Sequence, residues 1–193
     1  HPTDSAAPLG AEMRPLPPLL GLLPCAVVAN YEIFTQRYSA DPAPLVTGGR
    51  MYITTSHDLA NNTGWNMRDY NCLSSDDLVN WRDEGIVFSM DTVRWANLAW
   101  AQQVVEAPNG TFLMAFPGMG GNFSWSYPGG VGIASSTSPA GPFVDQLGKA
   151  IMPGDDPTLF VDKRTGEVHL CSNLNGPNCG ILAADLKSWT VPP

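Results

Sequence analysis

The sequence is poor in charge and in metal-binding residues. Only 15% of its 193 residues are charged, and 18 acidic against 10 basic side chains give a net charge of −8. Nucleic-acid-binding domains are usually basic, so this balance argues against a nucleic-acid partner. No run of about 18 apolar residues occurs, so no membrane-spanning helix is predicted. The three histidines and four cysteines form neither a His cluster nor a CxxC pair, which argues against a structural zinc site.

Glycine and proline, by contrast, are abundant, with 19 and 18 copies. Both residues are typical of proteins built from short strands and turns. No stretch of any length has the 3.6-residue apolar period of an amphipathic helix. The composition therefore predicts an all-β protein, and 193 residues are enough for one domain with a sizeable core.

Three strand-rich units repeat along the chain, at about residues 38–90, 95–145 and 150–193. Each has a short apolar strand, a turn, a returning apolar strand and a third strand with small and polar residues. Turns such as "APNG" and "RTG" supply the positive φ of a hairpin. Such repeats predict β-propeller blades, and a β-sandwich is the alternative. Because propellers have about four to eight blades, we expect the chain to contain only part of a propeller, over residues 30–193.

The N-terminal 29 residues have a different composition. Residues 13–29, "MRPLPPLLGLLPCAVVA", are either a signal-peptide-like segment or a Pro-rich arm that packs on the domain. Three N-glycosylation sequons, at Asn61, Asn109 and Asn122, favour surface loops of a secreted protein. We therefore expect an extracellular glycoprotein.

The four cysteines suggest one disulfide. The segment "CSNLNGPNC" contains the residues of a tight turn, so Cys171 and Cys179 could form a bridge. Removal of a signal peptide would take Cys25 with it and leave Cys72 without a partner.

Two aspartates occupy equivalent positions in the first and third units. Asp41 in "SADPAPLV" and Asp156 in "DDPTLFV" both precede a proline and an apolar strand. Proline disfavours the helical conformation for the residue before it, so we expect an extended backbone that directs both carboxylates. Either the two residues open turns, or they face one cavity. Paired carboxylates in a cavity are typical of glycoside hydrolysis, in which one activates water and another protonates the leaving oxygen.

Four other side chains are candidates for sugar binding. Trp95 and Trp100, in "VRWANLAWAQ", lie between the first two units and could stack on sugar rings. His57 follows a strand and could hydrogen-bond a hydroxyl, or it could be a buried structural histidine. Asp69 lies at a strand entrance and could bind substrate or cap a loop.

At these residues the sequence resembles family 43 glycoside hydrolases, which are five-bladed propeller enzymes. The matching segments include "NYEIFTQRYSADPAPLV", "MRDYNCLSSDDLVNWRDEGIVF", "WANLAWAQQVVEAPNGTFLMAFP" and "DDPTLFVDKRTGEVHL", and the resemblance covers residues 30–189. It implies a β-xylosidase or α-L-arabinofuranosidase that acts on xylan or arabinan side chains and inverts the anomeric configuration. The chain departs from relatives at "AWAQQV", where they often have "AWAPQV".

The resemblance also implies roles for particular residues. Asp41 would be the general base, and Asp156 would tune the pKa of the general acid, with the choice of Asp156 over Asp155 resting on the Asp-Pro register. The acid would be a glutamate of a fourth blade, which we expect this chain to lack. No cofactor is required; the family sometimes holds calcium in its channel, but no ligands for it can be identified here. The alternative is a non-catalytic, truncated propeller that binds carbohydrate or folds only on association.

Overall fold

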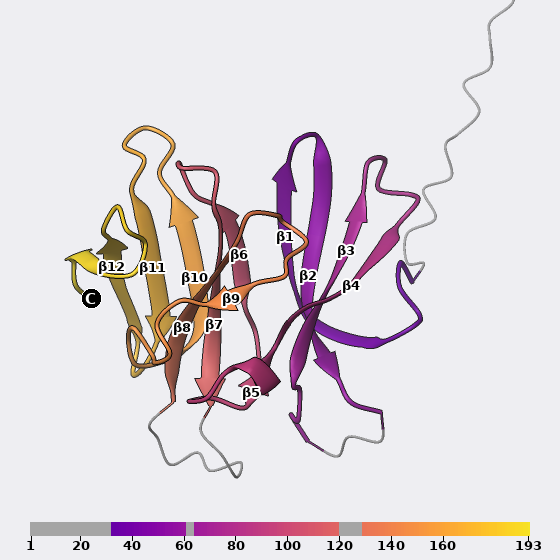
Figure 1. Ribbon diagram of the computed structural model, residues 1–193, viewed down its shortest axis with the longest axis horizontal. Coiled ribbons are helices and arrows are strands. Elements are labelled where there is room, and N and C mark those ends of the chain that lie inside the picture. Colours follow the sequence, from indigo (N-terminus) through magenta and orange to yellow (C-terminus); the bar gives the residue numbers. More distant parts are fainter. Residues whose placement is uncertain (1–31, 61–63, 120–128) are drawn as a thin grey trace, which may run out of the picture. The chain divides into compact units, whose positions relative to one another are not determined.

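The computed structural model describes residues 32–60, 64–119 and 129–193. The predicted signal-like segment and the sequons at Asn61 and Asn122 lie outside these ranges. The described chain forms three antiparallel sheets in chain order (Figure 1). The first contains β1 (Tyr38–Thr47), β2 (Arg50–Asp58), β3 (Asp69–Ser75) and β4 (Arg82–Ser89). The second contains β5 (Leu98–Ala99), β6 (Gln103–Glu106), β7 (Phe112–Met119), β8 (Gly130–Ser136) and β9 (Val144–Asp145). The third contains β10 (Asp155–Val161), β11 (Val168–Asn173), β12 (Pro177–Leu182) and β13 (Trp189–Val191).

Each sheet is a meander in which consecutive strands pair. The orders are β1-β2-β3-β4, β5-β7-β8-β9 with β6 also paired to β7, and β10-β11-β12-β13. The only helix in the described ranges is a 3₁₀ turn, η1 (Met90–Thr92). The predicted all-β class and the threefold repeat are therefore confirmed. The first strand of the second sheet is split into β5 and β6, and β6 contacts both β1 and β10, so the first strands of the three sheets lie together.

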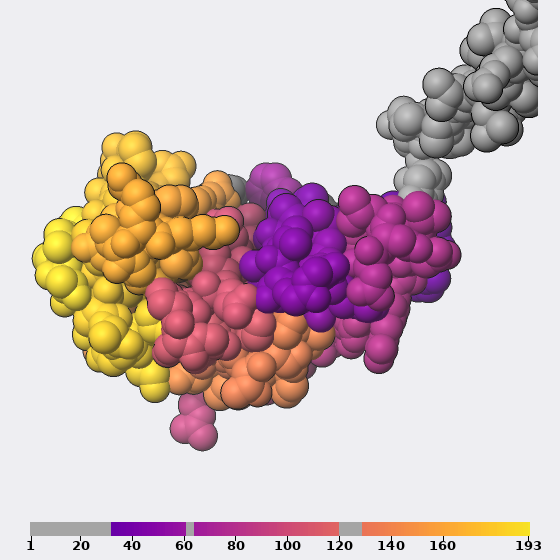
Figure 2. Space-filling view, turned by 90° about the horizontal axis from the view of Figure 1, so that it is seen from above, coloured from indigo at the N-terminus to yellow at the C-terminus, as the bar shows by residue number. Residues whose placement is uncertain are grey.

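The second sheet lies between the other two (Figure 2). Every residue of β7, "FLMAFPGM", is buried, because both faces of this sheet are covered. Successive side chains of a strand point to opposite faces. Met114 and Phe116 accordingly enter the core shared with the first sheet, and Leu113 and Ala115 enter the core shared with the third. An unbroken apolar strand is thus the sequence signature of the central sheet.

Aromatic rings fill the core between the first two sheets. Phe116 is fully buried, with its ring centroid 4.9 Å from that of Phe88 and 5.7 Å from that of Trp95. Tyr70 is also fully buried and stacks on Phe88 with 6.2 Å between centroids. This cluster holds the first sheet, which carries Asp41, against the second.

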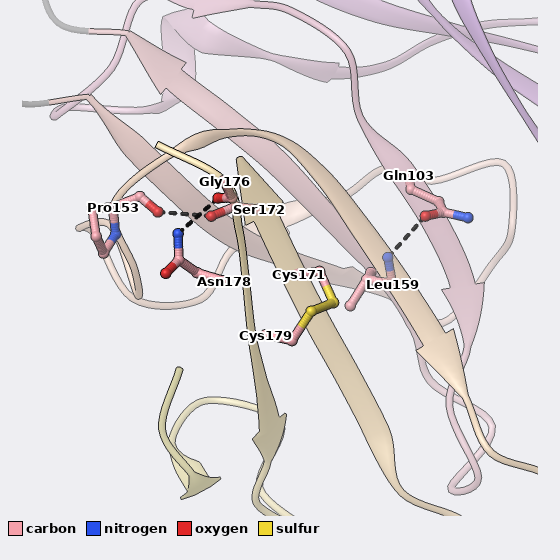
Figure 3. Close-up of a disulfide and its surroundings, with 8 residues drawn as sticks. All are labelled: Gln103, Pro153, Leu159, Cys171, Ser172, Gly176, Asn178 and Cys179. Carbon is pink, nitrogen blue, oxygen red and sulfur yellow. Dashed lines mark hydrogen bonds between the residues drawn. A yellow bond between two sulfur atoms is a disulfide. The ribbon is translucent and has the colours of Figure 1, made fainter. Parts of the chain in front are cut away.

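The third sheet carries the predicted disulfide. Cys171 on β11 lies directly opposite Cys179 on β12, and the two are bonded (Figure 3), so the predicted pairing is confirmed. Cys72 is free and buried, and burial raises the pKa of its thiol to about 12. Its side chain is therefore a thiol at neutral pH and behaves as a small apolar core residue.

Side-chain hydrogen bonds also hold β10 in place. The side-chain oxygen of Gln103 on β6 accepts from the backbone N–H of Leu159 on β10 at 2.8 Å (Figure 3). Ser172 on β11 donates to the carbonyl of Pro153, at the entrance to β10, at 2.8 Å. These bonds fix β10, and with it Asp156, relative to the rest of the chain.

Candidate active site

Asp41 and Asp156 occupy matching β-bulges. In the first sheet Ala40 pairs with Ser56 and Ala43 pairs with Thr54, so Asp41 and Pro42 together oppose one residue. In the third sheet Asp155 pairs with Asn173 and Thr158 with Cys171, which leaves Asp156 and Pro157 opposite one residue. A bulge bends its strand and redirects a side chain, and bulges are over-represented next to active sites. The two sequence-equivalent aspartates are therefore equivalent in backbone geometry as well.

The backbone at both aspartates is left-handed. Their φ angles are 51° for Asp41 and 45° for Asp156. The expectation that proline would hold them extended was wrong, because each bulge requires one residue to turn out of the strand. Asp and Asn tolerate this region better than most residues other than glycine. Residues held in sparsely populated conformations cluster at active sites, so the shared conformation supports a shared functional role.

A third bulge lies at the corresponding place in the second sheet. Ala99 pairs with Gly118 and Gln103 pairs with Ala115, so three residues of the first strand oppose two of β7. Ala101 and Gln102 stand there where the other sheets have Asp-Pro. Gln102 is only 5% exposed, and its amide has no hydrogen-bond partner within the described ranges. Two of the three equivalent bulges thus carry a carboxylate.

A buried hydroxyl holds the carboxylate of Asp41. Ser56 on β2 is fully buried and donates from Oγ to Oδ2 of Asp41 at 2.7 Å. Tyr70 on β3 pairs with Ser56 across the sheet, and its hydroxyl has no hydrogen-bond partner among the described residues. Burial raises the pKa of Tyr70 well above its ordinary value, and the charge of Asp41 raises it further. Tyr70 therefore stays protonated beside the carboxylate.

Asp156 has different neighbours. Its chain neighbour Asp155 is half-buried, and the pKa of Asp155 is raised first by burial and then by the charge of Asp156. Asn173 pairs with Asp155. It therefore occupies the position equivalent to Ser56, which pairs with Ala40 in the first sheet. Two like charges side by side favour retention of a proton. Asp41 thus has a hydroxyl donor, whereas Asp156 has a second carboxyl group.

His57 and Asp69 are brought together by the structure. The ring nitrogen Nδ1 of His57 donates to Oδ1 of Asp69 at 2.7 Å, and the two side chains are 22% and 21% exposed. The pair lies at the same end of the first sheet as Asp41, because Ser39 on β1 pairs with His57. Strand alternation directs His57 to the opposite face from Ser56. Sugar binding by this pair stays a prediction.

The comparisons with known proteins identify the family. A family model described as "Glycosyl hydrolases family 43" matches residues 33–190. The chain belongs to glycosyl hydrolase family 43. It is 35% identical over 118 residues to a xylosidase/arabinosidase of Bacteroides ovatus, covering 56% of this chain and 35% of that protein. It is 30% identical over 155 residues to an arabinoxylan arabinofuranohydrolase of Bacillus subtilis (strain 168), covering 64% and 29%.

Solved structures of family 43 members have the same fold. An α-L-arabinofuranosidase of Clostridium thermocellum is 35% identical, with a TM-score of 0.65 over 83% of this chain and 56% of that one. A β-xylosidase/α-arabinofuranosidase from a compost microbial metagenome, solved with xylotriose, has a TM-score of 0.72 at 24% identity, over 83% and 59%. The three sheets are therefore about three blades of a five-bladed β-propeller. The chain spans about a third of the two curated relatives and less than two thirds of these structures.

Trp95 of this family 43 chain has the contacts of a packing residue. A Cβ added at Gly118 or Gly132 would lie 2.3 or 2.6 Å from its ring, so these glycines leave room for the indole. Its Nε1 donates to Oδ2 of Asp145 at 2.9 Å. These contacts explain the position of the Trp95 side chain without a ligand. They do not test its predicted role in sugar binding.

Trp100 lies in the gap between β5 and β6, directly before the bulge residue Ala101. Its Nε1 donates to the carbonyl oxygen of Trp65 at 2.8 Å, and the two rings meet edge to face with 6.2 Å between centroids. Trp65 is 55% exposed. Sequence reasoning did not select Trp65, and Trp100 stays a predicted stacking residue.

Within the described ranges, no group of three His, Cys, Asp or Glu side chains could hold a metal ion. Calcium thus stays an expectation from the family. No helix of the described residues is long and apolar enough to cross a membrane.

Proposed function

We propose that the protein hydrolyses terminal xylosyl or arabinofuranosyl units of plant polysaccharides with inversion, and that Asp41 is the general base. The observation that supports this most is the pair of matching bulges, which place Asp41 and Asp156 in the same left-handed conformation. The relatives and solved structures of the family bear names of xylosidases and arabinofuranosidases. Inverting hydrolysis uses one carboxylate to activate water and one carboxylic acid to protonate the leaving oxygen.

The geometry suits Asp41 to the base role. Ser56 donates a hydrogen bond to Oδ2 of Asp41. The other oxygen, Oδ1, can therefore accept a proton from water as that water attacks the anomeric carbon. Asp41 is solvent-exposed although its donor Ser56 is buried, so the carboxylate is both held in place and accessible. Asp156, beside a carboxyl group of raised pKa, would orient and tune the acid.

The general acid has no candidate among the described glutamates, of which Glu32 lies before the first strand. Glu106 lies at the turn end of β6 and accepts from Thr47. Glu84 is bonded to Ser74 and Arg82, and Glu167 faces Thr165 and His169. None lies in a bulge equivalent to that of Asp41. We therefore propose that a residue outside the described ranges supplies the acid. The alternative function is carbohydrate binding without turnover.

The assay that tests the proposal uses nitrophenyl α-L-arabinofuranoside and nitrophenyl β-D-xyloside. Turnover of either substrate is expected from protein that includes the residue supplying the general acid. Sugar binding without any turnover would contradict the proposed hydrolysis and favour the binding alternative.

Replacing Ser56 with alanine is expected to lower kcat about tenfold, because a hydrogen bond to a charged group contributes about 1.5–3 kcal/mol. Ser56→Thr keeps the hydroxyl and should retain most of the rate. Ser74→Ala is the matched control, since Ser74 is also a fully buried serine bonded to a carboxylate, that of Glu84, in the same sheet. Equal losses of kcat in Ser56→Ala and Ser74→Ala would show that Ser56 has only a structural role.

We also propose that the protein is secreted and N-glycosylated at Asn109. This residue is exposed in the turn between β6 and β7, and its side-chain oxygen accepts from the N–H of Thr111 at 2.9 Å. When the protein is produced in a eukaryotic secretory pathway, a glycan removable by peptide N-glycosidase is expected on the peptide that contains Asn109. It should be lost in Thr111→Ala. An unmodified peptide in the unsubstituted protein would disprove the assignment.

A further inference from the structure

The residue opposite each bulge differs between the three sheets. In every sheet this position directly follows the residue that pairs with the first residue after the bulge. In chain order these residues are Thr55, Phe116 and Ser172. Thr55 and Ser172 are buried and carry a hydroxyl, and they lie opposite the bulges of Asp41 and Asp156. Phe116 lies opposite the bulge that has no carboxylate. A buried hydroxyl thus accompanies each candidate catalytic aspartate.

In the first sheet the hydroxyl is joined to the chain that leads into the bulge. The side chain of Asn71 on β3 is fully buried, and its Nδ2 donates to Oγ1 of Thr55 at 2.6 Å and to Oγ of Ser39 at 3.2 Å. Ser39 stands on β1, two residues before Asp41. One buried amide therefore links three strands, and it connects the residue opposite the bulge to the residue that leads into it.

In the third sheet the corresponding link is direct. The Oγ of Ser172 donates to the carbonyl oxygen of Pro153 at 2.8 Å (Figure 3), and Pro153 stands three residues before Asp156. Between them, Gly154 has a φ of 115°, and a Cβ added there would lie 2.3 Å from Oγ of Ser172. The backbone of Gly154 thus lies against the hydroxyl, an approach that a residue with a Cβ would block.

Both bulges need such support, because their aspartates have a left-handed backbone. A residue in a sparsely populated conformation keeps it only where the surrounding structure over-determines it. The links supply two constraints at once, since they hold the strand opposite the bulge and the chain that enters it. In the first sheet Thr55 also precedes Ser56, the donor to Asp41. The direction of each carboxylate therefore depends on the link behind its bulge.

We infer that Thr55, acting through Asn71, and Ser172 are positioning residues, which fix the carboxylates of Asp41 and Asp156 by fastening the chain that enters each bulge. The inference rests on the proposed function. It gives the two hydroxyls a role in the reaction without any contact with the substrate.

Thr55→Val tests the first link, because it removes the hydroxyl and keeps the branched shape of the side chain. In protein that includes the residue supplying the general acid, kcat for the nitrophenyl pentosides should fall about tenfold with KM within about twofold, since misplacement of a catalytic group slows the reaction. Thr55→Ser keeps the hydroxyl and should retain most of the rate. Thr54→Val is the matched control, because Thr54 is a buried neighbour whose hydroxyl bonds to the thiol of Cys72 in the core.

The titration of Tyr70 gives a readout that needs no turnover. The charge of Asp41 contributes to the raised pKa of Tyr70, and Thr55→Val changes no charge. If the link holds the carboxylate in place, the pKa of Tyr70 should fall in Thr55→Val. It should also fall in Ser39→Ala, which breaks the link at an exposed residue and so does not threaten folding. Thr54→Val should leave it unchanged.

Two results would overturn the role of Thr55. One is a pKa of Tyr70 that neither Thr55→Val nor Ser39→Ala changes, and the other is an equal loss of kcat in Thr54→Val. If the pKa of Tyr70 falls as expected but no protein turns over either substrate, the proposed function fails and the link between Thr55 and Asp41 stands.

Ser172→Ala tests the second link through the pH dependence of kcat. A negative charge raises the pKa of a neighbouring carboxylic acid, so Asp156 held beside the general acid would keep that acid protonated to higher pH. The alkaline limb of the profile should therefore move to lower pH in Ser172→Ala and stay in place in Ser74→Ala, which also removes a fully buried serine hydroxyl. A fall in kcat at every pH with an unmoved limb would show that Ser172 only stabilises the fold.

Discussion

Replacing Asp41 with asparagine is expected to lower kcat for the nitrophenyl pentosides by about 10²–10⁴-fold, the usual contribution of a general base. Asparagine has nearly the same shape, and its side-chain oxygen can still accept from Ser56. The KM should change little, since the substitution removes proton transfer and leaves the site intact. Initial rates at several substrate concentrations measure both constants.

Asp76→Asn is the control for Asp41→Asn. Asp76 is an exposed aspartate that pairs with Arg50 at the other end of the same sheet, and its loss should leave kcat within about twofold. A comparable fall in both variants, or an unchanged kcat in Asp41→Asn, would rule out Asp41 as the base.

The same variant has a readout that does not depend on turnover. The charge of Asp41 is the second cause of the raised pKa of Tyr70, after burial. A negative charge disfavours tyrosinate, so its removal should lower the pKa of Tyr70. The pKa should still stay above its ordinary value, because burial remains. Carbon NMR of labelled tyrosine across alkaline pH would follow this change. A pKa of Tyr70 that is unchanged in Asp41→Asn would contradict the closeness of the two groups.

Phe116→Ala is expected to lower the free energy of unfolding by about 3–5 kcal/mol. Phe116 is fully buried between Phe88 and Trp95, in the core that joins the first two sheets. Truncation would leave a cavity that a well-packed core cannot fill. Urea unfolding followed by tryptophan fluorescence measures the effect.

Phe160→Ala is the matched control for this core substitution. Phe160 lies on β10 and is 58% exposed, so its loss should change stability by less than about 0.5 kcal/mol. Similar effects for both phenylalanines would contradict the assignment of Phe116 to the core between the first two sheets.

The repeat made much of the fold predictable. The strand-and-turn pattern recurs three times, and the unbroken apolar run "FLMAFPGM" indicates a strand that is buried on both faces. The "CSNLNGPNC" hairpin could be predicted for the same reason, since its turn residues bring Cys171 opposite Cys179. Asp41 and Asp156 could be matched because each precedes a proline at the same place in its unit.

Features that depend on pairing between strands could not be predicted. The bulges arise from the register of β1 on β2 and of β10 on β11, and that register is not visible in one strand. Ser56 is one of several small polar residues in "TTSHD", and only cross-strand geometry singles it out. Trp95 has the sequence context of an exposed loop residue. Its packing depends on Gly118 and Gly132 in two neighbouring strands, and a glycine within a strand is the signal that could have indicated it.

The anomeric form of the first sugar released tests the central claim most directly. Proton NMR during hydrolysis of nitrophenyl α-L-arabinofuranoside or β-D-xyloside distinguishes the two anomers before mutarotation mixes them. If water activated by Asp41 attacks from the face opposite the leaving group, the first product is β-arabinofuranose or α-xylose. First release of the anomer with the substrate's own configuration would mean a covalent intermediate and would contradict the role of Asp41 as general base.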